Sequence, residues 1–595
     1  MGIKAMNLYP QALFRASLVC LAAILGALPP AKGDETLRLS VYATAGDVQR
    51  HLATAENREK AVRILQGWKV SRIFLEGRRG DEYVSPDTLA AVRDFFVAKG
   101  IRASGGIATV PGQRFGTRQN EALGWLNWES EKTRQDIAGF FTENAPLFDE
   151  LIVDDFFCTA DSSPESGRAR GHRLWSEYRR DLLTGLIDPL MLQPARAAKP
   201  AVRMILKFPQ WYDRFHLFGY DPPRMAAPFD QVWVGTEVRN PKTRRMGFVQ
   251  PTEGYMNFRW LASVAGEKVV GAWFDHIECS AQNFIDQAYG SVLAGARELT
   301  LFRLGDVLEG HPGDALLASR WPELFELAAR VRGQRRGGLA FYKPPGSDAD
   351  ENLYLMDYLG MIGLPILPVA QYPASDRVAI LAVQAAADPE VLDRMRRHLR
   401  RGATLIVTPA FVRRAGPAAA KLAGVKVGSA SGPATATEAR VGRAAFPLPV
   451  PFELDAGLKA TGSRIVVSAG VGGKPVPLLT TRRAGGGRVL VLNVRTFSEQ
   501  DYRETGEWLL APKARGLPEI PQELADQLRK TLLGPLGIHL EAPAGVAFYL
   551  FDDARCLYNF RDQPVTLLLD GERFELGANQ WRWQAPHRPQ RRSGK

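Results

Sequence analysis

Cysteine is scarce in this chain. The 595 residues include 4 cysteines, and the three beyond the first 33 residues are Cys158, Cys279 and Cys556. So small and odd a number excludes a scaffold held together by disulfides. Cys158 and Cys279 each follow a predicted strand, so a single bridge between them stays open. We expect free buried thiols instead.

Histidine is also scarce, and the motifs of two hydrolase classes are missing. The chain has 8 histidines, no two of them separated by one residue, and neither an H-E-x-x-H nor a G-x-S-x-G sequence. Two histidines with one residue between them, and the H-E-x-x-H motif, are typical of metal-dependent hydrolases. The G-x-S-x-G motif is typical of serine hydrolases. His276 lies near Asp275 and Glu278, which leaves a metal-dependent hydrolase as a minor alternative. We expect no metal and no other cofactor.

Long hydrophobic runs are absent beyond the N-terminus. Lys4 and Arg15 precede the apolar run Ala16–Leu28, and small residues lead on to Gly33. This pattern predicts a signal peptide over residues 1–33. The run is shorter than the ~20 residues that cross a bilayer, which disfavours the alternative of a membrane anchor. We expect a periplasmic or secreted bacterial protein with no membrane span in the mature chain.

Positive charge exceeds negative charge, with a net charge of +12 and a pI near 9.5. The basic residues are scattered, except in a tail at 586–595, and no nucleic-acid-binding module is recognisable. The excess suits an acidic partner such as an anionic polysaccharide, or reflects an arginine-rich proteome. We expect no nucleic-acid partner. The length predicts roughly three domains.

Eight short apolar segments alternate with helical or irregular stretches in the first half of the chain. Continuous apolar strands that alternate with helices indicate parallel βαβ units, and eight of them in roughly 300 residues indicate a closed (β/α)8 TIM barrel, here over residues 34–336. An open doubly wound sheet would show a glycine-rich turn after strand one, and residues 43–47 do not match it. The predicted strands are Leu37–Tyr42, Ser71–Leu75, Ile101–Thr109, Leu151–Val153, Val202–Phe208, Gln231–Gly235, Val269–Phe274 and Glu298–Arg303.

Carboxylates follow five of these strands, and aromatic residues lie between them. In this fold the strand ends meet at one mouth, where the chemistry takes place. Two carboxylates can cleave a glycosidic bond as acid and nucleophile or base, while flat rings stack on sugars. A single such acid is more often a salt bridge or a helix cap. The acids are Glu76, Asp154, Asp155, Glu237, Asp275, Glu278 and Asp306.

Asp154 and Asp155 are adjacent, so they cannot both face inward, because alternate strand residues face opposite ways. We favour Asp155 for catalysis and keep Asp154 as a candidate, with ion pairing at the rim as the alternative for the pair. The catalytic partner stays open among Glu237, Asp275 and Glu278. The predicted substrate contacts are Glu76, Trp211, Tyr212, Trp233, Trp273 and His276.

The second half continues as an open α/β domain over residues 337–538, with a β-rich insertion at about 414–483. A small antiparallel β domain follows at 539–585. This arrangement resembles the barrel, amidotransferase-like domain and C-terminal β domain of family-42 β-galactosidases. Active amidotransferases use a cysteine, and none lies between Cys279 and Cys556, so we expect a structural role or a homo-oligomer contact for the second domain.

The strand positions of the predicted catalytic pair resemble those in two kinds of galactosidase barrel. A pair after strands four and six resembles the placement in α-galactosidase-like barrels. A pair after strands four and seven resembles β-galactosidase-like barrels, although those have glutamate where this chain has Asp155. The sequence therefore predicts an exported glycoside hydrolase acting on an oligo- or polysaccharide, with a non-catalytic carbohydrate-binding barrel as the alternative. Carboxylate spacings of about 5–5.5 Å or 6.5–9.5 Å would favour the enzyme.

Overall fold

The computed structural model describes residues 36–120, 123–243, 250–428, 433–505 and 516–585. The predicted signal peptide and the basic tail lie outside these ranges. Among the described residues, no helix is both long and apolar enough to cross a membrane. Cys158, Cys279 and Cys556 are unpaired, as expected for free thiols.

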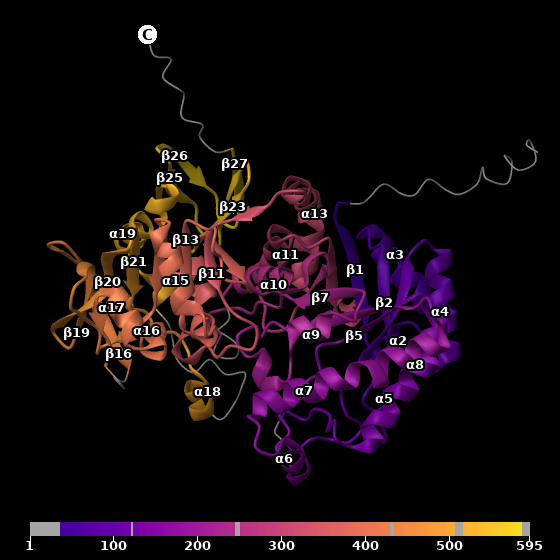
Figure 1. Ribbon diagram of the computed structural model, residues 1–595. Helices are drawn as coiled ribbons and strands as arrows, with labels where there is room; N and C mark the ends of the chain where they lie inside the picture. The colour runs from indigo at the N-terminus through magenta and orange to yellow at the C-terminus, as the bar shows by residue number, and fades with distance from the viewer. Residues whose placement is uncertain (1–35, 121–122, 244–249, 429–432, 506–515, 586–595) are drawn as a thin grey trace, which may run out of the picture. The chain divides into compact units, whose positions relative to one another are not determined.

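The first half forms the predicted eight-stranded parallel barrel (Figure 1). Strand β1 pairs with both β2 and β9, which closes the sheet. A short strand β3 (Glu82–Tyr83) adds an antiparallel hairpin to the end of β2. The barrel strands are β1 (Arg38–Ala43), β2 (Arg72–Arg79), β4 (Arg102–Ala108), β5 (Glu150–Val153), β6 (Arg203–Phe208), β7 (Gln231–Gly235), β8 (Val269–Asp275) and β9 (Glu298–Phe302).

Helices connect the barrel strands, and several begin where a polar side chain caps the first turn. Ser85 accepts a hydrogen bond from Thr88 N–H ahead of α4, and Ser280 accepts one from Asn283 N–H ahead of α11; such caps satisfy free amides at the helix start. The helices are α2 (Ala45–His51), α3 (Ala55–Gly67), α4 (Pro86–Ala98), α5 (Glu131–Asn144), α6 (Pro164–Arg170), α7 (Trp175–Ile187), α8 (Gln193–Ala198), α9 (Pro222–Ala226), α10 (Glu253–Ala265), α11 (Ala281–Ala294), α12 (Leu304–Glu309) and α13 (Pro312–Val331).

The barrel interior is filled in layers. At the N-terminal ends of the strands, Arg72 forms buried ion pairs with Glu150 and Glu298. Above it lies an apolar layer made of Tyr42, Phe74, Ile152, Ile205, Trp233, Val270 and Trp273. These layers close the barrel from below, so polar side chains that face inward from the strand ends line the opposite mouth.

The second domain is built on one mixed nine-stranded sheet. Its parallel part has the order β12 (Ile366–Val369), β11 (Leu339–Tyr342), β13 (Val378–Leu381), β14 (Thr404–Val407) and β21 (Gly487–Leu492). The predicted β-rich insertion continues this sheet, because β20 pairs antiparallel with β21. The added strands are β20 (Lys474–Ala484), β19 (Arg464–Val471), β16 (Pro433–Val441) and β17 (Ala444–Asp455).

The second domain also contains helices, and two small antiparallel sheets follow its large sheet. The helices are α14 (Leu355–Met361), α15 (Val391–Arg400), α16 (Pro409–Ala415), α17 (Pro417–Ala423), α18 (Glu499–Thr505) and α19 (Gln522–Leu533). One small sheet has the order β10 (Arg336–Gly337), β23 (Val546–Phe551), β24 (Arg555–Asn559) and β27 (Trp581–Gln584). The other has β22 (Leu540–Glu541), β25 (Val565–Leu569) and β26 (Glu572–Leu576).

Candidate active site

Lys207 joins two of the predicted catalytic carboxylates. On β6 the side chain of Ile205 lies in the barrel interior, and Lys207, two residues on, faces the same way. Its Nζ atom donates to Oδ2 of Asp155 at 2.7 Å and to Oε1 of Glu237 at 2.8 Å. The two oxygen atoms are therefore no more than about 5.5 Å apart, the sum of these distances. Asp155 follows β5 and Glu237 follows β7, the two strands on either side of β6.

The two carboxylates differ in their exposure. The Asp155 side chain is 15% exposed and that of Glu237 is 5% exposed. Burial raises the pKa of Glu237 to about 7, and the negative charge of Asp155 acts in the same direction, against the ammonium of Lys207. Burial alone would lower the pKa of Lys207, but the two carboxylates raise it above its usual value. Lys207 thus stays charged, while Glu237 can carry a proton near neutral pH.

One carboxyl oxygen of Glu237 makes no hydrogen bond in the described structure. Within the described part of the chain, its Oε2 atom is buried and has no hydrogen-bond partner. On the other side of the pair, the Tyr220 hydroxyl donates to the backbone carbonyl of Asp155, which fixes the start of the segment after β5. A buried carboxyl oxygen without a partner is costly in a structural role.

A second polar network lies beside this pair. Glu76 is fully buried and accepts hydrogen bonds from the Tyr42 hydroxyl at 2.7 Å and from Nη2 of Arg79 at 2.8 Å. Arg79 also lies 3.6 Å from Asp154, which accepts from the amides of Thr109 and Phe156. Burial raises the pKa of Asp154 to about 7, although the charge of Arg79 opposes this. Asp154 therefore faces the interior, and Asp155 faces Lys207.

The other two predicted acids have different surroundings. Asp275 accepts two hydrogen bonds from the guanidinium group of Arg239 and one from the amide of Ile277, so three of its about four lone pairs are already used. Glu278 lies in the segment between β8 and α11, is partly exposed and has a positive φ of 53°. Neither residue is a partner of Lys207 in the described structure, which leaves Glu237 as the partner that the geometry provides for Asp155.

The predicted aromatic contacts divide into two groups. The ring of Trp273 lies 4.6 Å from Nζ of Lys207, a cation–π contact, and Trp211 is partly exposed on the loop after β6 and lies 5.9 Å from Trp125. Trp233 and Tyr212 are fully buried. Trp233 donates to Thr300 inside the barrel, and Tyr212 donates to Asp357 of the second domain. Both residues make these hydrogen bonds within the protein, and their contact with a sugar stays a prediction.

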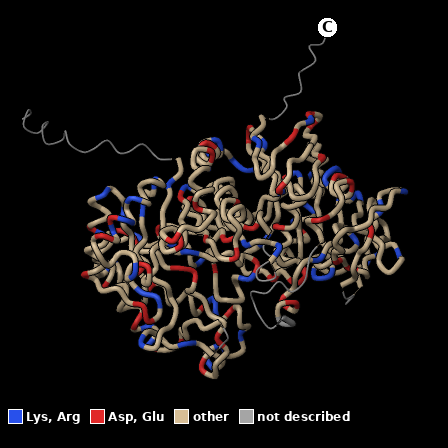
Figure 2. Tube along the Cα trace, turned by 180° about the vertical axis from the view of Figure 1, so that it is seen from behind, with Lys and Arg blue, Asp and Glu red and all other residues tan. Residues whose placement is uncertain are grey.

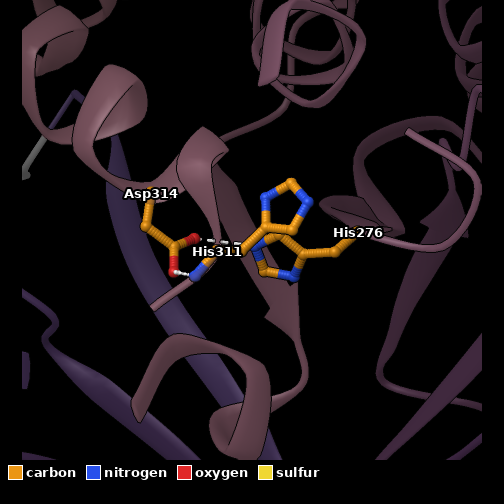
Figure 3. Close-up of side chains that lie close together, drawn as sticks. All are labelled: His276, His311 and Asp314. Atoms are coloured by element: carbon orange, nitrogen blue, oxygen red, sulfur yellow. Dashed lines mark hydrogen bonds and ion pairs between the residues drawn. The ribbon is translucent and has the colours of Figure 1, made fainter. Parts of the chain in front are cut away.

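His276 belongs to a separate cluster near the ends of β8 and β9 (Figure 3). Its Nε2 atom lies 2.7 Å from Oδ1 of Asp314, and the backbone amide of His311 donates to Oδ2 of the same carboxylate. One potential ligand atom from each of His276, His311 and Asp314 lies within 4.8 Å of the other two. A divalent ion bound through Nε2 of His276 and Oδ1 of Asp314 would replace the hydrogen bond between these atoms. In the described structure these side chains do not contact Lys207.

Sequence analysis missed the residues that hold the carboxylates: Lys207, Arg79, Arg239 and Tyr42. A signal for Lys207 was available, since it is a charged residue between Leu206 and Phe208 in an apolar stretch and shares a face with Ile205. Arg79 and Arg239 each follow a predicted acid, Glu76 and Glu237, by two or three residues. Charged residues at inward positions near strand ends therefore mark this site as clearly as the acids do.

A barrel with paired carboxylates at its mouth is typical of the glycoside hydrolase class. The family model described as the catalytic domain of probable glycosyl hydrolases matches residues 28–326, and the chain belongs to this family. A second model, described as the second domain of the uncharacterized protein SSO3021, matches residues 335–432. SSO3021 itself, from Saccharolobus solfataricus, is 25% identical over 373 residues, which cover 55% of this chain. The match spans 59% of the length of that relative.

Solved structures share the three-part architecture. The β-galactosidase of Bacillus circulans sp. alkalophilus aligns with a TM-score of 0.62 and 11% identity, covering 93% of this chain and 99% of its own. A GH42 β-galactosidase of G. stearothermophilus gives 0.60 and 10%, covering 93% and 98%. The α-L-fucosidase isoenzyme 2 of Paenibacillus thiaminolyticus gives 0.61 and 12%, covering 92% and 93%. At such identities the fold is shared, which confirms the resemblance to family-42 architecture.

Proposed function

We propose that this protein is an exported glycosidase that uses Asp155 and Glu237 as its catalytic pair and retains the configuration of the sugar. The observation that carries this proposal is the position of Lys207 between the two carboxylates. One oxygen atom of each carboxylate lies within about 5.5 Å of one oxygen atom of the other, which is compatible with the spacing of about 5–5.5 Å between the carboxyl groups of retaining enzymes.

The surroundings of each acid support a distinct role. Glu237 has a raised pKa of about 7 and an unpartnered Oε2 atom, so it donates a proton to the leaving oxygen. Asp155 is more exposed and is paired with a cation, so its carboxylate attacks the anomeric carbon as the glycosidic bond breaks. Glu237 then removes a proton from water, which attacks the same carbon and releases Asp155.

Neighbouring residues prepare this pair for the reaction. Lys207 positions both carboxylates and places its positive charge beside them. Arg79 and Arg239 hold Asp154 and Asp275, and thereby balance the negative charge around the mouth. Trp211, partly exposed on the loop after β6, offers a flat face to a sugar ring.

The substrate we propose is an oligo- or polysaccharide outside the cytoplasm. Family membership supports a carbohydrate substrate. The charged start, the apolar run Ala16–Leu28 and the small residues up to Gly33 support export. Among the similar structures are β-galactosidases and an α-L-fucosidase, so a test should begin with aryl β-galactosides and α-L-fucosides and extend to a wider glycan panel.

The test combines turnover with trapping of the intermediate. On a substrate found in that panel, Asp155→Asn should lower kcat by about 10⁴-fold or more, since the nucleophile is lost. A 2-fluoro glycoside of the same sugar should leave one added sugar on the Asp155 peptide by mass spectrometry. NMR of the first product should show retained configuration. Full turnover by Asp155→Asn would refute the assignment, and binding without turnover in the wild type would favour the carbohydrate-binding alternative.

A further inference from the structure

A basic cavity lies in the second domain, apart from the barrel mouth. Its volume is about 1170 Å³, and its lining residues come from the segments 374–404, 464–488 and 527–535. Charged residues of both signs are distributed along the whole chain (Figure 2). The cavity departs from this mixture, since six basic side chains line it against the single acid Asp376. The six are Arg377, Arg401, Arg464, Arg483, Arg488 and Lys530.

These six side chains lack internal counter-charges. All six residues are exposed, and none forms an ion pair with a carboxylate in the described part of the chain. Two helix C-termini, those of α15 and α19, also border the cavity. Each contributes about half a negative charge. Together with Asp376 they offset about two of the six positive charges, which leaves a net charge of about +4.

One pair of arginines is placed at a cost to the fold. Arg483 on β20 lies directly opposite Arg488 on β21 in the antiparallel register. Like charges at such positions destabilise a sheet. Arg464 on β19 pairs with Thr481, which shares a face of β20 with Arg483. The same face of the sheet therefore carries three arginines side by side, an arrangement that an anion would stabilise.

The lining also indicates what kind of anion would bind. The described residues around the cavity include no Trp, Tyr or Phe, so a neutral sugar has no ring to stack on and the bases of a single-stranded nucleic acid have none either. Hydroxyl and amide groups of Thr481, Gln527 and Thr531 lie among the cations and can bond hydroxyl groups. The volume of the cavity exceeds the range of about 300–1,000 Å³ that is usual for small-ligand sites.

We propose that this cavity binds a segment of an anionic polysaccharide that carries carboxylate or sulfate groups. The choice of a glycan rests on the membership of the glycosyl hydrolase family, and the site itself requires no catalytic pair. The cavity would hold one part of a charged polymer on the second domain while the barrel mouth acts on another part. Because the attraction is electrostatic, binding weakens as salt rises.

The test measures binding of labelled oligosaccharides to the full chain by fluorescence anisotropy. The probes are an oligogalacturonate, a sulfated dextran fragment and an unmodified dextran of equal length. We expect at least one anionic probe to bind about tenfold or more tightly than the neutral dextran, with an affinity that falls in high salt. Equal binding of the neutral dextran, no binding of either anionic probe, or tighter binding of a DNA duplex would overturn the proposal.

Two variants localise the site. Arg488→Glu places a carboxylate opposite Arg483, which should preserve or raise Tm while it weakens anion binding about tenfold or more. Arg443→Glu is the matched control, an exposed arginine of the same domain outside the cavity, and should leave binding within about twofold. Equal losses in both variants would contradict a defined site. Asp155→Asn should bind the probes like the wild type, so failure of the catalytic proposal leaves this result intact.

Discussion

Gly235, the last residue of β7, leaves room for the side chain of Glu237 two residues further on. A Cβ atom added to Gly235 would overlap Oε2 of Glu237, and it would also lie 3.1 Å from the backbone of Pro209 and Gln210. The added methyl group has backbone on one side and the Glu237 carboxyl group on the other. The absence of a side chain at position 235 therefore gives Glu237 its position beside Lys207.

The first prediction follows from this contact. Gly235→Ala should displace the Glu237 carboxyl group and lower kcat about 100-fold or more, since loss of a positioned acid costs 10²–10⁴-fold. KM should change less, and the circular dichroism spectrum should keep its shape. Steady-state kinetics on the substrate identified by the glycan panel measures the effect.

A second glycine provides the control for that substitution. Gly290 lies within α11, where an added Cβ would meet only an ordinary contact at 4.0 Å. Gly290→Ala should keep kcat and raise the stability by about 0.5–1 kcal/mol, because alanine is favoured over glycine inside a helix. Wild-type kcat in Gly235→Ala would show that Glu237 does not need its present position.

The pH dependence of activity should report the proton on Glu237. Its pKa is raised to about 7, and the reaction needs the protonated form. We therefore expect kcat/KM to fall about tenfold per pH unit above about pH 7. Glu237→Gln, assayed with an aryl glycoside whose leaving group needs no proton, should lose this alkaline limb.

Asp154 provides the control for the pH profile, because burial also raises its pKa to about 7. Asp154→Asn should keep the alkaline limb, since Asp154 is held by Arg79 and by backbone amides. A limb that disappears in Asp154→Asn and persists in Glu237→Gln would reverse the two assignments.

The sequence predicted the barrel and its acids more completely than the contacts between them. The eight strands were recognisable because buried parallel strands are continuously apolar. Lys207 was overlooked because one lysine in such a strand reads as an interruption until the inward face is worked out. Trp233 shares a face with Gly235 but is fully buried in the apolar layer of the barrel interior, a depth that the alternation of the strand does not reveal. Tyr212 is held by Asp357, 145 residues away, and no local pattern indicates that contact.

Metal removal tests the rival chemistry at His276. The proposed reaction uses two carboxylates and needs no metal. Treatment with a chelator should therefore leave kcat within about twofold of its original value. His276→Ala should then lower stability, because its bond to Asp314 and its stacking on Phe284 are lost, with a smaller effect on kcat. Loss of activity on chelation that zinc restores in the wild type, and not in His276→Ala, would instead identify a metal-dependent hydrolase.

Stability should fall as pH rises, and Asp286 is one cause. This carboxyl group of α11 is buried, accepts hydrogen bonds from Tyr558 at 2.6 Å and from Gln282 at 2.8 Å, and has a pKa raised by burial to about 7. The value in the unfolded chain is about 3.9. A raised pKa contributes stability that is fully present below about pH 4 and is lost as pH rises through about 7, up to about 4 kcal/mol in total.

Asp286→Asn does not titrate and should flatten urea unfolding free energies measured between pH 5 and pH 8. Tyr558→Phe keeps the carboxyl group and removes a bond that lowers its pKa, so its pH dependence should remain or steepen; an unchanged slope in Asp286→Asn would place the titrating group elsewhere.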